Sequence, residues 1–172
     1  MNWNIDPAHT TASFKVRHLG LTTVRGTFSG ITGSAQTDDQ NHLHSLHVQI
    51  PTATVNTGNA DRDAHLQSAD FFDAAQFPNL EFTSTSITRS GDGYTIQGNL
   101  AIHGVTRPVT FQAEANGPAT DPFSGTPKLG GEASLEISRK DYGLTWNAPI
   151  EAGGVLVSDK VTIQLEVEAV QA

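Results

Sequence analysis

The sequence contains no cysteine, which excludes disulfides, thiol catalysis and cysteine-ligated metal sites. It has few basic residues: 10 Lys and Arg stand against 18 Asp and Glu, which gives a net charge of −8. This acidity argues against sequence-independent binding of nucleic acid, which needs clustered cations opposite the phosphates. No apolar run approaches the roughly 18 residues of a transmembrane helix, so we expect no transmembrane segment.

The first residues, from Met1 to Asp6, lack the basic start and apolar stretch of a secretory signal peptide. We therefore expect a cytoplasmic protein, or a periplasmic one if a signal was removed. The length of 172 residues is that of one ordinary domain, so residues 1–172 are predicted to form a single domain.

Apolar and polar residues alternate in eight stretches with a period of two, the period of a strand with one buried face. These stretches are 11–18, 23–30, 46–50, 80–82, 94–102, 109–115, 133–138 and 161–168. Clean alternation is typical of antiparallel sheets. Eight such strands close into a barrel or fold into a sandwich, so the sequence predicts an all-β protein.

Two segments interrupt the strand pattern. In 59–77, Asn59 suits a helix N-cap and Pro78 ends the segment, so we predict one or two short helices there. Their phenylalanines either gate one end of the barrel or fill its core. The glycine- and proline-containing segment 117–131 is predicted to be a long loop.

Small residues recur on the apolar strand faces, among them Gly26, Gly30 and Gly98. They either allow the sheet to curve or leave space for a ligand. Eight-stranded barrels fill their interior with side chains or hold one small ligand, and this composition favours a ligand.

Two polar residues end apolar faces, His18 and Arg139. A buried arginine needs a partner, for which Asp61, Asp63, Asp70 and Asp141 are candidates. The plain interpretation is a hydrogen-bonded histidine and a structural ion pair. The functional interpretation is a polar head-group site, which would consist of His18, Arg62, Asp63, Arg139 and Asp141.

Signals for catalysis or metal binding are weak. The sequence lacks a nucleophile elbow, a His-Glu-x-x-His motif and a phosphate-binding glycine loop. Asp61 with His65, and His42 with His44 and His47, have ligand-like spacing, but helix capping and adventitious metal binding explain them better. We predict no catalytic residue, no metal and no cofactor, with His18 or His103 as the general base if the protein is an enzyme.

Motifs along nearly the whole chain resemble those of the YceI-like proteins, which are described as polyisoprenoid-binding. They are WNIDPAHT (3–10), FKVRHLG (14–20), VRGTF (24–28), RDAHL (62–66), DFFD (70–73), FP (77–78), GNLAIHGVTRPV (98–109) and ISRKDYGLTWN (137–147). The resemblance implies an eight-stranded antiparallel up-and-down barrel of lipocalin-like shape. It also implies a pore that holds an isoprenoid or another long lipid, and a homodimer.

We therefore expect the chain to bind a long apolar lipid, a polyisoprenoid or an isoprenoid quinone, for carriage or storage. The alternatives are an enzyme that acts on such a lipid and a stress-related dimer with an incidental ligand. The expected ligand contacts are Phe14, Val16, His18, Val24, Phe28, Val48, Ile50, Leu66, Phe71, Phe72, Phe77, Phe82, Leu100, Ile102, Ile137, Arg139, Asp141 and Trp146.

Overall fold

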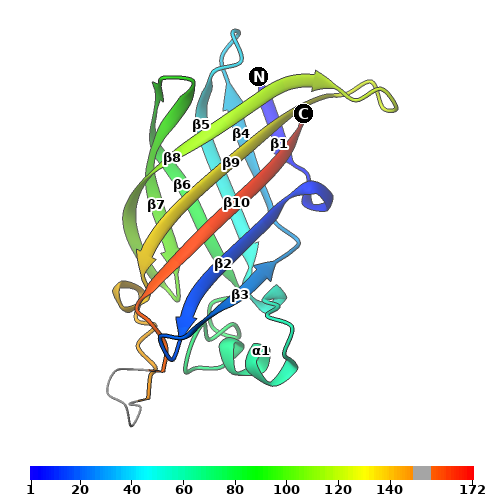
Figure 1. The fold of residues 1–172 in the computed structure, drawn as a ribbon. Coiled ribbons are helices and arrows are strands. Elements are labelled where there is room, and N and C mark those ends of the chain that lie inside the picture. Colours follow the sequence, from blue (N-terminus) through cyan, green and yellow to red (C-terminus); the bar gives the residue numbers. More distant parts are fainter. Residues whose placement is uncertain (149–155) are drawn as a thin grey trace.

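The computed structural model describes residues 1–148 and 156–172, which form mainly β-strands (Figure 1). The strands are β1 (Asn2–Ile5), β2 (Thr11–His18), β3 (Thr22–Phe28), β4 (Thr32–Thr37), β5 (Leu43–Pro51), β6 (Asn79–Ser90), β7 (Gly93–Ile102), β8 (Val105–Thr120), β9 (Pro127–Ser138) and β10 (Lys160–Gln171). The helical elements are α1 (Ala60–Gln67) and the 3₁₀ turns η1 (Pro7–His9), η2 (Thr52–Thr54) and η3 (Arg139–Tyr142). Among these described residues, no helix is long and apolar enough to cross a membrane.

The strands close into an eight-stranded antiparallel barrel, as the resemblance predicts, and not into the sandwich that the alternation also allowed. β1 and β2 act as one strand that is interrupted at η1, because both pair with β10. β3 and β4 likewise act as one strand, since β3 pairs with β2 and β4 pairs with β1. Each remaining strand pairs with its neighbours in sequence, and β1 closes the ring against β10.

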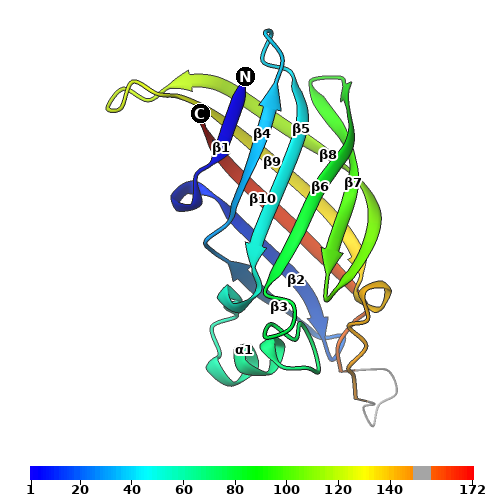
Figure 2. The same cartoon turned by 180° about the vertical axis from the view of Figure 1, so that it is seen from behind.

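Two strands escaped the sequence analysis. β1 is only 4 residues long, and β4 reads Thr-Gly-Ser-Ala-Gln-Thr, which offers little hydrophobic contrast between its faces. Their inward side chains are nevertheless buried, and Trp3 Nε1 donates to Thr37 Oγ1 over 2.9 Å. β1 and β4 thus complete the end of the barrel at which both chain termini lie (Figures 1 and 2).

The prediction of a long loop over 117–131 is wrong. β8 and β9 continue as a paired hairpin, with Ala119 opposite Lys128, and only a short turn joins them. Figures 1 and 2 show that this hairpin projects beyond the barrel rim. Most residues of the projecting part of β8 are exposed, so the alternation that identifies strands disappears there.

The predicted helical insertion is confirmed as α1 with turns on either side. Asn59 caps the helix, its Oδ1 accepting from Arg62 N over 3.0 Å. The insertion lies beside the free edge of β3, where the main chains of Thr27 and Asn56 exchange two 2.9 Å hydrogen bonds. Because β5 ends at Pro51, residues 52–78 cover a part of the barrel wall that no strand closes.

Candidate lipid-binding site

A cavity of about 320 Å³ lies inside the barrel, with walls contributed by all eight strands. This volume lies at the lower end of the roughly 300–1,000 Å³ that is usual for ligand pockets. The walls consist of the inward residues of the alternating stretches, which are aliphatic or aromatic almost throughout. The cavity therefore suits an apolar ligand.

Nearly all the residues expected to contact a ligand line this cavity, and two lie elsewhere. The residues at the cavity are Phe14, Val16, His18, Val24, Phe28, Val48, Ile50, Leu66, Phe71, Phe72, Phe82, Leu100, Ile102, Ile137, Arg139 and Trp146. Phe77 instead packs against His103, with ring centroids 5.1 Å apart. Asp141 is exposed, and its backbone carbonyl accepts from Arg107 Nε over 3.1 Å.

The glycines on the inward faces make room for protein side chains. A Cβ on Gly26 would overlap the ring of Phe14, its cross-strand partner, and a Cβ on Gly98 would overlap the ring of Phe82. Both aromatic rings line the cavity. The space left by these two glycines is therefore occupied by aromatic wall rather than by ligand.

One end of the cavity, which we call the mouth, is formed by Arg17, His18, Arg62, His65 and Trp146. His65 stacks edge-on against Trp146, with ring centroids 4.8 Å apart. Its Nε2 lies 2.8 Å from Asp70 Oδ2, so Asp70 rather than Asp61 orients this ring. Phe71 completes the group, 5.3 Å from Trp146. His65 and Phe71 of the helical insertion thus form an aromatic cluster with Trp146 at the mouth.

Among the described residues, the charged side chains that line the cavity are of one sign. Arg17, Arg62 and Arg139 line the cavity, whereas no carboxylate does so among the described residues. Arg62 is held by Thr57, with Nε to Oγ1 at 2.7 Å and Nη2 to the carbonyl at 2.8 Å. Asp63, expected in a head-group site, instead accepts from the backbone and hydroxyl of Thr57.

Arg139 is 3% exposed and donates to backbone carbonyls. The acceptors are Ser158 (2.8 Å), Leu144 (2.7 Å), Trp146 (2.9 Å) and Val157 (3.2 Å). The expected ion pair with Asp61, Asp63, Asp70 or Asp141 is absent from the described salt bridges. Burial lowers the pKa of Arg139, and the nearby Asp159 carboxylate partly offsets this effect. Arg139 therefore ties together the chain segments around the mouth.

The candidate metal-binding histidines are separated by other partners. His42 Nδ1 lies 3.2 Å from Asp38 Oδ2, and His47 Nε2 lies 2.7 Å from Glu81 Oε1. His44 is exposed. These histidines form no group of metal-binding geometry in the described part of the chain.

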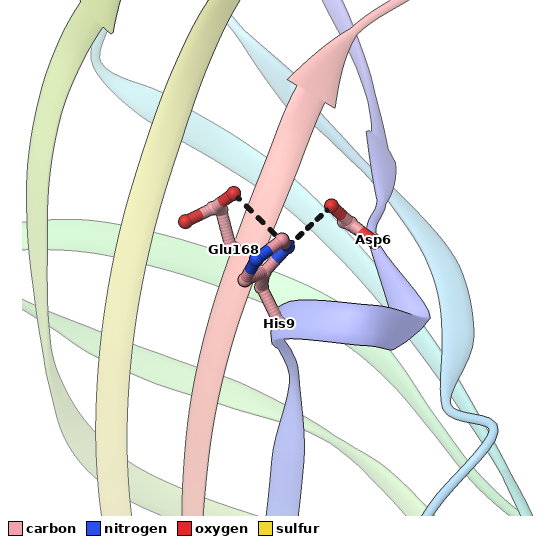
Figure 3. Close-up of side chains that lie close together, drawn as sticks. All are labelled: Asp6, His9 and Glu168. Atoms are coloured by element: carbon pink, nitrogen blue, oxygen red, sulfur yellow. Dashed lines mark hydrogen bonds and ion pairs between the residues drawn. The ribbon is translucent and has the colours of Figure 1, made fainter. Parts of the chain in front are cut away.

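The sequence analysis missed a cluster of Asp6, His9 and Glu168 on the outside of the barrel (Figure 3). His9 Nδ1 lies 2.9 Å from Asp6 Oδ2 and 3.6 Å from Glu168 Oε1. The hydrogen bond to Asp6 raises the pKa of His9, and the same bond lowers the pKa of Asp6. Since Lys128 Nζ also lies 2.7 Å from Glu168, an ion-pair network explains this cluster. It braces η1, where β1 gives way to β2.

Comparison with known proteins gives one consistent family. The family model described as "YceI-like domain" matches residues 3–169. Protein YceI of Salmonella arizonae is 38% identical over 164 residues, which cover 95% of this chain and 82% of that protein. The crystal structure of the Campylobacter jejuni YCEI protein has a TM-score of 0.77 and 31% identity over 91% of this chain and 90% of its own. A domain from Saccharophagus degradans described as polyisoprenoid binding has a TM-score of 0.71 and 15% identity, covering 99% of this chain and 98% of its own.

Proposed function

Since this chain belongs to the YceI-like family, we propose that it binds a long apolar lipid inside the barrel, a polyisoprenoid or an isoprenoid quinone, for carriage or storage. The observation that carries the proposal is the apolar cavity inside the closed barrel. The Saccharophagus degradans domain of similar fold, described as polyisoprenoid binding, supports the same ligand class.

The energetics of burial support a long chain as the ligand. Each CH₂ group taken from water contributes about 0.8 kcal/mol, so a segment of ten buried groups contributes about 8 kcal/mol before the costs of association and ordering. Such a ligand is held by its length and needs no polar contact along the walls. The wall residues, such as Leu100 and Ile102, offer just this kind of surface.

The lining favours binding over catalysis. Among its described residues, Ser13 supplies the one hydroxyl, and no carboxylate stands ready to orient His18. His103, the other candidate base, lies outside the cavity, with its Nδ1 3.1 Å from the carbonyl of Tyr142. Neither His18 nor His103, the two candidate bases of the enzyme hypothesis, is therefore paired with a carboxylate in the cavity, and the homodimer stays a prediction.

Lipid extraction and a blocked variant test the proposal. Solvent extraction of the purified protein, followed by mass spectrometry, should release an isoprenoid. Leu100→Trp should fill the bore and abolish this lipid, because Leu100 faces the cavity. Asn99→Trp is the matched control, since Asn99 is exposed on the same strand, and it should retain the lipid. A folded Leu100→Trp protein with a full complement of lipid would contradict the proposed site.

A further inference from the structure

The outer face of β2, β3 and β10 near the mouth carries a group of exposed cations, which we call the basic wall. It consists of Lys15, Arg17, Arg25 and Lys160. Lys15 lies directly opposite Arg25 on β3 and opposite Thr162 on β10, two residues beyond Lys160. Like charges directly opposite each other in a sheet are destabilising. In the described part of the chain, neither Lys15 nor Arg25 has a carboxylate within salt-bridge distance, so an external anion would relieve this repulsion.

An exposed apolar residue lies at the tip of the same hairpin. Leu21 is 75% exposed in the turn between β2 and β3, and its N–H donates to the carbonyl of His18 over 3.0 Å. Arg17 lies under this turn, with Nη2 3.1 Å from the carbonyl of Gly20 and 3.3 Å from that of Leu21. The hairpin tip therefore combines an exposed leucine with the basic wall.

The hairpin also borders the mouth of the cavity. Arg17 and His18 line the cavity, and Leu19 N donates to the carbonyl of Leu156, another lining residue, over 2.9 Å. A surface that contacts the hairpin tip would thus lie beside the mouth of the cavity.

The opposite end of the barrel is rich in carboxylates and poor in cations. Its carboxylates are Asp6, Asp38, Asp39, Asp92, Glu114, Asp121, Glu132, Glu166 and Glu168. Its cations are Arg89 and Lys128, and Lys128 is already paired with Asp121 and Glu168. Phe123, which is 99% exposed at the tip of the β8–β9 hairpin, therefore stands among negative charges. An anionic surface would repel this end and attract the basic wall.

We propose that the basic wall and Leu21 dock the protein onto a bilayer that contains anionic lipids. Lys and Arg side chains near such a surface interact with its head groups, and an apolar side chain at the tip enters the interface. The described carboxylates at the mouth end lie on 61–73 and at Glu81, Glu136, Asp141 and Asp159. Since Glu136 Oε1 lies 3.5 Å from Lys160 Nζ, contact centres on Lys15, Arg17 and Arg25 of β2 and β3. This inference rests on the proposed function for its purpose, since a carrier of apolar lipid must meet a membrane, but its test needs no bound lipid.

Flotation with vesicles of phosphatidylcholine, with and without phosphatidylglycerol, tests the proposal. The protein should float with the anionic vesicles alone, and it should be released when the ionic strength rises from about 0.1 to about 1 M, which shortens the Debye length from about 10 to about 3 Å. Each cation near the surface is worth about fivefold in affinity, so Lys15→Gln/Arg25→Gln should bind about 25-fold more weakly. Leu21→Ser should bind about tenfold more weakly.

Matched controls come from the opposite end of the barrel. Arg89→Gln and Phe123→Ser make the same chemical changes there and should leave vesicle binding unchanged, with thermal melting as the check of folding. If the double variant fails to fold, Lys15→Gln alone should show a fivefold loss. The docking surface would be overturned by equal binding to both kinds of vesicle or by no binding to either. It would also be overturned if Phe123→Ser weakened vesicle binding as much as Leu21→Ser.

The vesicle test and the proposed function fail separately. Leu100→Trp, with its bore filled, should still float with anionic vesicles although it carries no lipid. Charge-dependent flotation of a protein that never yields lipid would refute the proposed function and leave the docking surface standing. A protein that yields lipid but does not bind anionic vesicles would refute the docking surface and leave the proposed function standing.

Discussion

Replacing Arg139 by methionine should destabilise the barrel without changing which head group it accepts. The guanidinium is buried and donates to the carbonyls of Ser158, Leu144, Trp146 and Val157. Methionine has a similar length but no donor, so Arg139→Met leaves these acceptors without a partner.

The expected loss follows from those four hydrogen bonds. A buried polar group without a partner costs about 1–3 kcal/mol, and water that enters beside the shorter side chain satisfies some of the carbonyls. We therefore expect a total loss of about 3–5 kcal/mol, which is large for a single substitution. For a protein of this size, each kcal/mol lowers the melting temperature by about 2–4 °C, so the shift should be about 10 °C. Arg139→Lys retains a charge and three donors and should lose less.

Urea unfolding and two ligands provide the assay. The urea concentration at the unfolding midpoint should fall, while the slope of unfolding free energy against urea concentration stays constant. Arg139→Met changes stability but not the surface that unfolding exposes. Affinities for a prenyl diphosphate and the matching prenyl alcohol should fall together or not at all. Unchanged stability with a selective loss for the diphosphate, of about 1.5–3 kcal/mol, would refute the structural role and indicate that Arg139 binds the head group.

Three further predictions test the wall, the insertion and the external ion pairs. Gly26→Ala should cost about 1–3 kcal/mol by urea unfolding, because its Cβ overlaps the Phe14 ring, and Phe14→Leu should recover part of that loss in the double variant. Phe72→Ala should cost less than the roughly 3–5 kcal/mol of a fully buried phenylalanine, yet accelerate stopped-flow release of a fluorescent prenyl analogue; an unchanged release rate would make this ring a core residue instead of a gate. The pKa of His9 is raised, so the stability that His9 contributes is present below pH 6.5, its ordinary pKa, and is lost as the pH rises through the folded-state pKa. The pKa of Asp6 is lowered, so the stability that Asp6 contributes is present above pH 3.8 and is lost on acidification. As the pH rises from 6.5, the melting temperature should therefore change less in His9→Gln than in the wild type, and parallel curves would contradict this account.

The barrel walls could be predicted because burial of one face imposes a period of two on the sequence. β10 is the clearest case, with alternating apolar residues from Val161 to Val167 on the cavity side. The pattern fails where both strand faces meet water, as in the projecting part of β8 from Gly117. It also fails in β4, where small residues such as Gly33 and Ala35 face inward.

The mouth was harder to predict, because its partners are distant in sequence or belong to the backbone. The periodicity placed Arg139 on an inward face, but it could not show that four backbone carbonyls would satisfy it, those of Leu144, Trp146, Val157 and Ser158. Every residue carries a backbone carbonyl, whatever its side chain, so the sequence does not indicate which carbonyls act as acceptors. Similarly, Glu168 joins Asp6 and His9 only because β10 passes beside η1.

The free edge of β3 has a consequence for how ligand preference can change in evolution. Closure of the barrel depends on strand pairing, whereas residues 52–78 contact β3 and the adjoining Ser29 through the pairs Thr27–Asn56, Phe28–Phe72 and Ser29–Thr54. Substitutions in this segment can reshape one side of the cavity without disturbing the ladder that folds the barrel. The same scaffold can therefore diverge toward ligands of different length or thickness while its eight strands stay unchanged.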